Sequence, residues 1–567
     1  MGDRTDPNNN PPTIKSCYNA NIRTLTIDPN DPNTLYAGAE SAVVFKSTDK
    51  GQHWQSISDS WAAYENISAI AVSKQHQGTI LALSGFYMQG DLYRSTDGGS
   101  SWEQLQSGIG NNWSGGRSVA IQYNPTSNRV YLAGKDGVYI SDDDGLSWQV
   151  ATGTNSILIT DIAINSTNSN IVYAVGSNAS SNLVLLRSID NGNTFQNVTG
   201  TSFNIDNHGA KIGVTDADGS IIYCIILTNS GPKLLNSTDS GQNWKLKSSS
   251  SQTGYEGSNT NTGLGLSNGQ GFYDLAIFVA PTDPKILIVG TTTMYKSTDG
   301  GQNFSPLGGW SYGPFGAFQD DTSHSGNNIH SDVHSILGVS GDTYIATDGG
   351  IAHSTDIFTN PNNADARNNG LSAAEYYGFE QGWQDDFVVG GRYHNGDAAL
   401  FEGYPTGTAL YIAGAESPSG NALPGYSMTA RFSDLYTTYI MPPTPSRTAL
   451  KEAPGIQSNM GPHSRNQWDG NIISKLMTDP RYRNVLYLSG NRIKDGYGNT
   501  DESSILWKST DTGVNYTSLH NFGSTVWRFD IARSNPDVII VYTDQGLYKT
   551  TNGGSSWNPL LSPLLLE

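Results

Sequence analysis

One short motif recurs along this chain at a near-constant spacing, and it restricts the possible folds more than any other feature. It reads Ser/Thr-x-Asp-x-Gly-x-x-aromatic, and its eight copies begin at Ser47, Ser95, Ser141, Ser188, Ser237, Ser297, Ser509 and Thr550, the last with Asn552 in the Asp position. The first five Asp positions, 49, 97, 143, 190 and 239, are 46 to 49 residues apart. A period of this size is typical of a repeat protein in which each unit packs against its neighbours. A damaged ninth copy, Ser354-Thr355-Asp356, lacks both the Gly and the aromatic residue.

The residue types of the motif predict a tight hairpin turn between two strands. Ser and Asp side chains bond backbone amides inside such a turn, and Gly supplies the positive φ that other residues resist. An apolar strand precedes the first copy at 43–45, and an Asp-Pro or Asn-Pro turn such as Asp28-Pro29 marks a second hairpin in several units. Each unit therefore holds about four antiparallel strands, which is the blade of a β-propeller.

The repeat resembles the Asp-box (BNR-repeat) propeller superfamily, which includes sialidases, two-propeller xyloglucanases and the sortilin ectodomain. The resemblance implies an all-β propeller of four-stranded antiparallel blades, with the Asp boxes on the outer rim. We expect about ten blades in one ring of the sortilin type, and two tandem propellers of the xyloglucanase type are the alternative. The resemblance also implies a secreted or cell-surface protein.

The regularity of the motif divides the chain into four segments. Residues 1–16 are expected to be a disordered leader or linker, and residues 17–365 hold regular Asp-box blades, of which we count seven. Residues 366–469 are expected to hold degenerate blades with long loops. Residues 470–567 hold Asp-box blades that close the ring or start a second propeller.

Charge and cysteine content exclude several classes of function. The formal net charge of −19 repels phosphate backbones, so no nucleic-acid partner is expected. No run of 18 apolar residues predicts a membrane span. The two cysteines, Cys17 and Cys224, form no CxxC pair, and the apolar run 221–227 around Cys224 predicts a buried strand.

A first candidate site lies where the repeat becomes irregular, in His330-Ser331-Asp332-Val333-His334. Strand alternation predicts that His330, Asp332 and His334 share one face, where they could bind a divalent metal, line a polar channel or contribute to catalysis. Asp348, in the Thr347–Gly350 stretch, follows this segment. The segment resembles an HxDxH…DGG element of secreted bacterial Asp-box proteins, in which it is structural.

A second candidate site combines aromatic and basic residues that could bind a sugar. Its members are Tyr377, Trp383, Arg392, Tyr393 and His394. Rings stack on the apolar face of a sugar while polar groups bond its hydroxyls, although filling of the core is the plainer interpretation. Related bacterial sequences often carry GGxQDNGT where this chain has Gly390-Gly391-Arg392-Tyr393-His394, so the role implied by that resemblance is in doubt.

The sequence leaves the activity open between three classes. We interpret the chain mainly as a binding or interaction module for a polysaccharide or a protein. A glycoside hydrolase or polysaccharide lyase is the alternative, because hydrolysis needs two carboxylates and candidates are available at Asp332, Asp348, Asp385 and Asp397. The Phe/Tyr-Arg-Ile-Pro start of sialidases and the N-terminal Asp-Val-Gly-Gly element of xyloglucanases are absent. A structural module of a larger adhesin is the third possibility.

Overall fold

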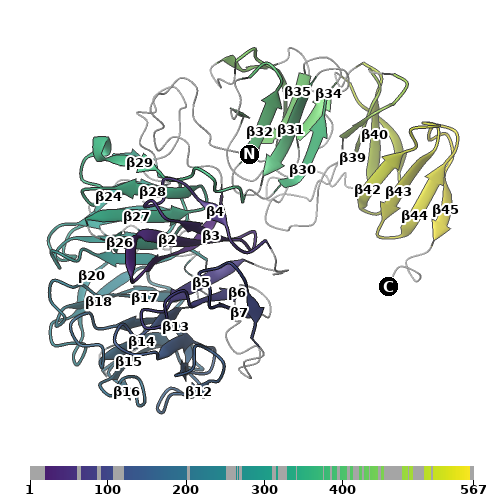
Figure 1. The fold of residues 1–567 in the computed structure, drawn as a ribbon. Helices are drawn as coiled ribbons and strands as arrows, with labels where there is room; N and C mark the ends of the chain where they lie inside the picture. The colour runs from purple at the N-terminus through teal and green to yellow at the C-terminus, as the bar shows by residue number, and fades with distance from the viewer. Residues whose placement is uncertain are drawn as a thin grey trace. The chain divides into compact units, whose positions relative to one another are not determined.

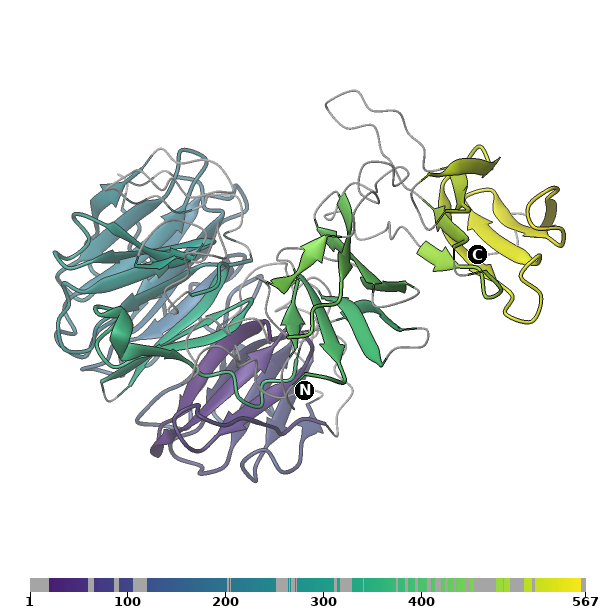
Figure 2. The ribbon, with the colours of Figure 1, turned by 90° about the horizontal axis from the view of Figure 1, so that it is seen from above.

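The computed structural model describes the chain from Ala20 to Leu561 with internal gaps. The gaps are 60–65, 86–90, 106–119, 201–202, 204, 251–263, 265, 267–270, 272, 310–313, 317–328, 340, 374–375, 383–385, 393–395, 405–408, 413–419, 424–426, 433–434, 445–448, 453–475, 483, 490–503 and 512–514. The chain forms two compact units, residues 1–373 and residues 374–567 (Figures 1 and 2). The predicted leader, residues 1–16, lies outside the described residues.

The first unit contains seven sheets that follow one another along the chain, and their strands are antiparallel except for the parallel pair β24–β25. Blades one to four are β1(Ile22–Asp28), β2(Asp31–Ala39), β3(Val44–Ser47), β4(Gln55–Ser56); β5(Ile67–Val72), β6(Ile80–Ser84), β7(Leu92–Ser95), β8(Glu103–Gln104); β9(Ile121–Tyr123), β10(Val130–Ala133), β11(Val138–Ser141), β12(Gln149–Val150); and β13(Leu158–Ile164), β14(Val172–Ser177), β15(Leu183–Ser188), β16(Gln196–Asn197). Blades five to seven are β17(Gly209–Gly213), β18(Ile222–Leu227), β19(Lys233–Ser237), β20(Lys245–Ser249); β21(Ala276–Val279), β22(Leu287–Gly290), β23(Thr293–Ser297), β24(Ser305–Gly309) with the short β25(Phe315–Gly316); and β26(Val333–Val339), β27(Asp342–Thr347), β28(Gly350–Ser354), β29(Ala364–Ala366).

Apolar strands explain why the blades stack face to face. The second and third strands of most blades are buried on both faces, and in β18 all six residues, Ile222 to Leu227, are buried. Continuous apolar runs of this kind suit a strand that is covered on both sides by neighbouring sheets. The free thiol of Cys224 lies in this strand, as the sequence predicted, and burial raises its pKa well above the usual value.

The Asp boxes form the predicted turns. In the first box, the Ser47 hydroxyl donates to Asp49 Oδ1 at 2.8 Å and accepts from the Gly51 amide at 2.8 Å. Asp49 Oδ1 also accepts from the His53 amide at 2.9 Å. Gly51 has a φ of 79°, which explains the preference for Gly at this position.

The damaged ninth box keeps the same geometry with different residues. Ser354 donates to Asp356 Oδ1 at 2.8 Å and accepts from the Phe358 amide at 2.9 Å. Phe358 therefore takes the place of the Gly, at a φ of 52°, and its ring packs edge-on against Phe315 with centroids 5.5 Å apart. Burial of the ring offsets the cost of a left-handed backbone at a residue with a side chain.

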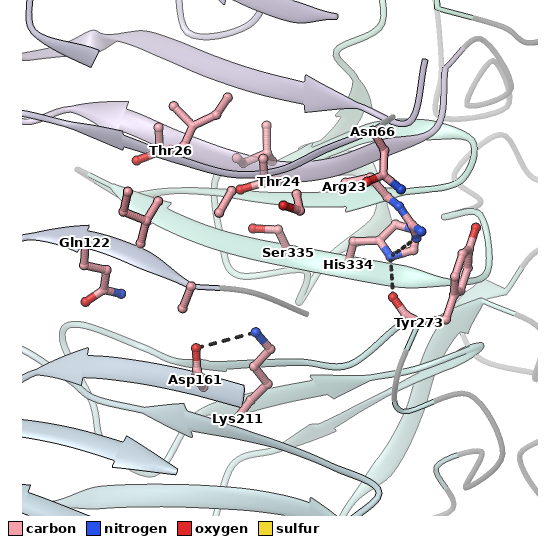
Figure 3. Close-up of a pocket in the computed structure, with 16 residues that line it drawn as sticks. Arg23, Thr24, Thr26, Asn66, Gln122, Asp161, Lys211, Tyr273, His334 and Ser335 are labelled. Carbon is pink, nitrogen blue, oxygen red and sulfur yellow. Dashed lines mark hydrogen bonds and ion pairs between the residues drawn. The ribbon is translucent and has the colours of Figure 1, made fainter. Parts of the chain in front are cut away.

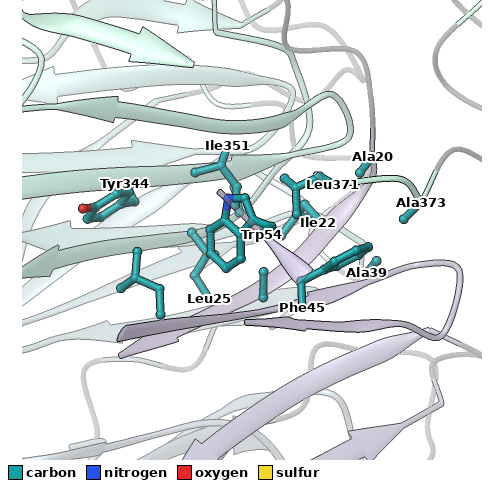
Figure 4. Close-up of a cluster of buried hydrophobic side chains, with 13 residues drawn as sticks. Ala20, Ile22, Leu25, Ala39, Phe45, Trp54, Tyr344, Ile351, Leu371 and Ala373 are labelled. Atoms are coloured by element: carbon teal, nitrogen blue, oxygen red, sulfur yellow. The ribbon is translucent and has the colours of Figure 1, made fainter. Parts of the chain in front are cut away.

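The ring of the first unit closes between blade seven and blade one. The Trp54 indole donates to the Arg367 carbonyl at 2.8 Å, and its amide donates to the Asn369 carbonyl at 2.9 Å. Ala20 and Ala373 form a parallel bridge. A shared core joins the two blades (Figure 4); it contains Ile22, Leu25, Phe45, Trp54, Tyr344, Ile351 and Leu371. The expectation of about ten blades in one ring is therefore wrong, because seven blades already complete a circle. The alternative, two tandem propellers, agrees better with the division of the chain into two units.

The second unit contains four sheets of the same kind. They are β30(Tyr376–Gln381), β31(Phe387–Arg392), β32(Gly396–Phe401), β33(Leu410–Tyr411); β34(Gly420–Leu423), β35(Ser427–Phe432), β36(Leu435–Ile440), β37(Lys451–Glu452); β38(Leu476–Thr478), β39(Leu486–Ser489), β40(Ile505–Ser509), β41(Thr517–Asn521); and β42(Val526–Ile531), β43(Ile539–Thr543), β44(Gly546–Thr550), β45(Asn558–Leu561). Two of these sheets fall within the segment 366–469, where degenerate blades were expected. Within the described part of the chain, the one helical element is the 3-10 turn η2(Pro361–Asn363), and no helix is long and apolar enough to cross a membrane.

Candidate functional site

The innermost strands of the seven blades surround a central channel, which forms a cavity in the first unit. Every blade contributes to its wall (Figure 3), and the polar members are Arg23, Thr24, Thr26, Asn66, Ser68, Gln122, Asp161, Lys211, Tyr273, His334 and Ser335. Leu25, Ile70 and Ile121 are among the apolar members. The cavity has a volume of about 230 Å³. The wall is therefore mixed, with hydrogen-bonding groups placed between aliphatic side chains.

A recurrent β-bulge helps to place polar side chains in this channel. In the first blade the register shifts between Ile22 and Thr24, and in the seventh it shifts between Val333 and Ser335. The residues skipped by these shifts are Arg23 and His334, and both line the cavity. A bulge inserts one residue into a strand and changes the direction of its side chain, and bulges are frequent beside functional sites.

His334 is held by a buried network on one side of the channel. Its Nε2 lies 2.5 Å from Asp348 Oδ1, and the Arg23 guanidinium lies 3.1 Å from its Nδ1. The Tyr273 hydroxyl donates to both carboxylate oxygens of Asp348, at 3.0 and 2.9 Å. Burial and the charge of Arg23 lower the pKa of His334, and Asp348 offsets part of that effect. The imidazole is therefore neutral near pH 7.

The same network compensates the charge of Arg23. Its guanidinium carbon lies 4.0 Å above the Tyr273 ring, and its Nη2 lies 3.8 Å from the Glu40 carboxylate. Asn21 donates to Glu40 and, at 3.2 Å, to the Tyr273 hydroxyl. Stacking on an aromatic ring beside a carboxylate is a favourable environment for a buried guanidinium. This arrangement fixes Arg23 in one position at the channel wall.

Two further carboxyl groups lie near this network. Asp274 is fully buried, and burial together with the neighbouring Asp332 raises its pKa well above the usual value. Asp332 itself has a φ of 61° and precedes the strand that carries His334. Burial beside another carboxyl group favours the protonated form of Asp274, in which it can donate a hydrogen bond.

An ion pair occupies another part of the wall. Lys211 Nζ lies 3.5 Å from Asp161 Oδ1, and Asp161 Oδ2 accepts from the Ile212 amide at 2.8 Å (Figure 3). Burial raises the pKa of Asp161, although Lys211 opposes this effect. Among the residues that line the cavity, Asp161 is the one carboxylate, so the wall does not hold a pair of carboxylates.

The first predicted site is only partly assembled. His334 and Asp348 are brought together, but the strand begins at Val333, so the predicted alternation that puts His330 and Asp332 on the face of His334 is wrong. The His330 ring nitrogen Nδ1 instead lies 2.9 Å from the Ser331 carbonyl. Among the residues that the structure describes, no three His, Cys, Asp or Glu side chains are arranged to hold a metal ion. The structure therefore gives no support to the metal interpretation of this segment.

The second predicted site falls largely outside the described residues. Trp383, Tyr393, His394 and the carboxylate candidate Asp385 lie in the gaps. Tyr377, Arg392 and the candidate Asp397 lie on β30, β31 and β32, but only their backbone is described. The register shifts between Tyr376 and Gly378, so Tyr377 takes in its blade the bulged position that Arg23 and His334 take in theirs.

Sequence reasoning missed most of the channel wall. Arg23, Asn66, Gln122, Asp161 and Lys211 come from the first strand of a blade or from the residue before it, and no Asp box marks them. The signal that could have identified these residues is their position in the repeat unit. Each regular unit begins with a strand, and a polar residue inside that strand is a candidate for the channel once the strand order is known.

No family model matches this chain. A segment of 162 residues is 30% identical to a probable oligoxyloglucan-reducing end-specific xyloglucanase of Neosartorya fischeri, and it spans 25% of this chain and 19% of that relative. The GH74 xyloglucanase of Xanthomonas campestris covers 96% of this chain and is itself covered to 74%, with a TM-score of 0.58 and 14% identity. An ancestral GH74 enzyme covers 97% and is covered to 77%, with a TM-score of 0.64 and 15% identity.

The chain has a xyloglucanase-like Asp-box propeller fold. The GH74 enzyme of Niastella koreensis agrees, with a TM-score of 0.51 over 97% of this chain and 86% of its own, at 15% identity. At such identities the likeness concerns the fold alone, so the xyloglucanase-like fold by itself does not carry residue roles.

Proposed function

We propose that the chain is a glycoside hydrolase that acts on a xyloglucan-like polysaccharide. The observation that carries the proposal is the fold match to GH74 enzymes along 96–97% of the chain, together with the segment that is 30% identical to a curated xyloglucanase. A polysaccharide substrate also agrees with the secreted or cell-surface location that the resemblance to Asp-box proteins implies. The acidic net charge of −19 does not oppose a neutral polysaccharide.

The geometry narrows the choice of hydrolytic carboxylates. Asp348 is fully buried and bonded to His334 and Tyr273, so a polysaccharide chain does not reach it. We assign it a positioning role within the wall of the first propeller. Of the other three candidates, Asp332 interacts with the fully buried Asp274 beside the same network. We therefore propose Asp385 and Asp397 as the pair that acts as acid and as base or nucleophile, because hydrolysis needs two carboxyl groups on either side of the scissile bond.

The test is release of reducing ends from xyloglucan by the full chain and by single Asp-to-Asn variants. Asp385→Asn and Asp397→Asn are each expected to lower kcat about 10²-fold to 10⁴-fold, the usual contribution of a general acid or base. Asp348→Asn should lower the thermal unfolding midpoint while the folded fraction keeps its activity. Asp216→Asn, at an exposed position of the first unit, is the matched control. If the unmodified chain releases no reducing ends from xyloglucan, the hydrolase proposal is wrong. If it nevertheless binds xyloglucan, the binding-module interpretation is favoured instead.

A further inference from the structure

The channel wall carries several polar groups without a partner in the protein. Within the described part of the chain, the side chains of Thr24, Thr26, Gln122 and Ser335 make no hydrogen bond, although all four line the cavity. Asn66 is 94% buried, since its exposed fraction is 6%, and its Oδ1 also has no partner. Buried polar groups such as Asn66 are normally satisfied, and the four side chains beside it are partly exposed to the cavity, so this part of the wall points to a ligand that supplies hydrogen-bond partners.

The charges of the wall favour a neutral ligand over an anion. Lys211 lies 3.5 Å from the carboxylate of Asp161, and Arg23 lies 3.8 Å from that of Glu40. Each cation of the wall thus has a carboxylate beside it, so neither offers uncompensated positive charge to a ligand. The groups that remain open are hydroxyls and amides, which bond to alcohols as both donors and acceptors.

The size and the apolar part of the wall favour a single sugar unit. The volume of about 230 Å³ is below the roughly 300–1,000 Å³ of pockets for drug-sized ligands. Aliphatic side chains of Leu25, Ile70 and Ile121 stand between the polar groups and suit the carbon-bound hydrogens of a sugar ring. A cavity of this volume has room for one sugar ring but not for a polysaccharide strand.

We propose that the channel of the first propeller binds one neutral sugar unit or a comparable polyol. Gln122 and Asn66 bond its hydroxyls from neighbouring blades, and Thr24 and Thr26 bond it from β1. All residues of this site belong to the first unit, whereas Asp385 and Asp397 belong to residues 374–567, so the proposal goes beyond the hydrolytic function and does not depend on it. Product or effector sugars are ligands of this chemistry.

The experiment is a calorimetric titration of the full chain with D-xylose, D-glucose and D-glucuronate as separate probes. We expect one saturable site with a Kd of about 1 mM for a neutral sugar. Gln122→Met keeps the shape of the side chain but removes its amide, and it should weaken binding about tenfold because two hydrogen bonds are lost. Thr26→Val, which is nearly isosteric, should weaken binding by a smaller factor. Gln196→Met, on the exposed outer strand β16, is the matched control and should bind like the unmodified chain.

Three outcomes would overturn the proposal. The first is that neither neutral sugar shows saturable binding up to about 100 mM, which is roughly a hundred times the expected Kd. The second is that D-glucuronate binds more tightly than the neutral sugars. The third is that the folded variants Gln122→Met and Thr26→Val keep the affinity of the unmodified chain. Thermal unfolding of each variant shows that it is folded. The rate of xyloglucan hydrolysis is measured on the same samples. Because both variants should keep the hydrolytic rate of the unmodified chain, a failure of the sugar-site proposal can be told apart from a failure of the hydrolase proposal.

Discussion

Substitution of Trp54 by Ala should open the first propeller at the seam between blade seven and blade one. Trp54 is 4% exposed, packs in the core shared by the two blades, and donates its indole hydrogen bond across the seam to Arg367. A buried Trp removes about 200 Å² from water, worth about 5 kcal/mol at about 25 cal/mol per Å². Measured large-to-small substitutions give a similar loss of about 3–5 kcal/mol.

Hydrogen exchange of the full chain measures this effect where it occurs. In Trp54→Ala the amides of β1–β4 and β26–β29 should lose about 3–5 kcal/mol of protection, and the amides of blade four should lose less. Trp148→Ala is the matched control, because Trp148 is half-buried and donates to Gly145 within its own turn. Equal losses at the seam in both variants, or no loss in Trp54→Ala, would refute the reasoning that this indole closes the ring.

Three further predictions follow from individual side chains. Phe358→Gly relieves a positive φ but removes a buried ring from its contact with Phe315, so it should lower the free energy of unfolding by about 3 kcal/mol in chemical denaturation; a stabilised variant would contradict the account. Stability should fall as pH drops through about 6.5, because the unfolded chain protonates His334 near its ordinary pKa while the folded chain keeps it neutral, and His334→Gln should flatten that slope in unfolding experiments at pH 5 to 7. In a Cys17→Ser background the buried thiol of Cys224, whose pKa is raised by burial, should react with a thiol reagent only after unfolding, and fast labelling of the native protein would count against its place in the core.

The repeat allowed the blade to be predicted but not the size of the ring. The Asp box is a local turn whose bonds run between residues four or fewer positions apart, such as Ser47, Asp49 and Gly51, so a single sequence is enough to recognise it. Closure depends on contacts between residues about 300 positions apart, such as Trp54 with Arg367 and Lys50 with Asp342. The motif alone does not distinguish a Trp that packs between consecutive blades from a Trp, such as Trp54, that packs between the last and the first blade of the ring.

The candidate site was predictable only where it coincided with a short motif. His334 and Asp348 were recognised because they are close together in sequence, and they are in contact. Arg23 and Lys211 come from blades one and five, so their meeting in one channel requires the strand order of the ring. The expected alternation of His330, Asp332 and His334 failed because Asp332 has a positive φ and the strand begins one residue later.

Closure at seven blades is the claim on which both the xyloglucanase-like fold and the sugar channel rest. Carbodiimide cross-linking of the unmodified chain tests it directly, because Lys50 Nζ lies 2.9 Å from Asp342 Oδ2 across the seam and a zero-length reagent joins such pairs. The account predicts an amide between Lys50 and Asp342 in the peptide masses, and it predicts that this product disappears in Lys50→Met. Cross-links from Lys50 to carboxylates of the last blade, residues 526–561, in place of Asp342 would show that blade one neighbours the end of the chain and would contradict the seven-bladed ring.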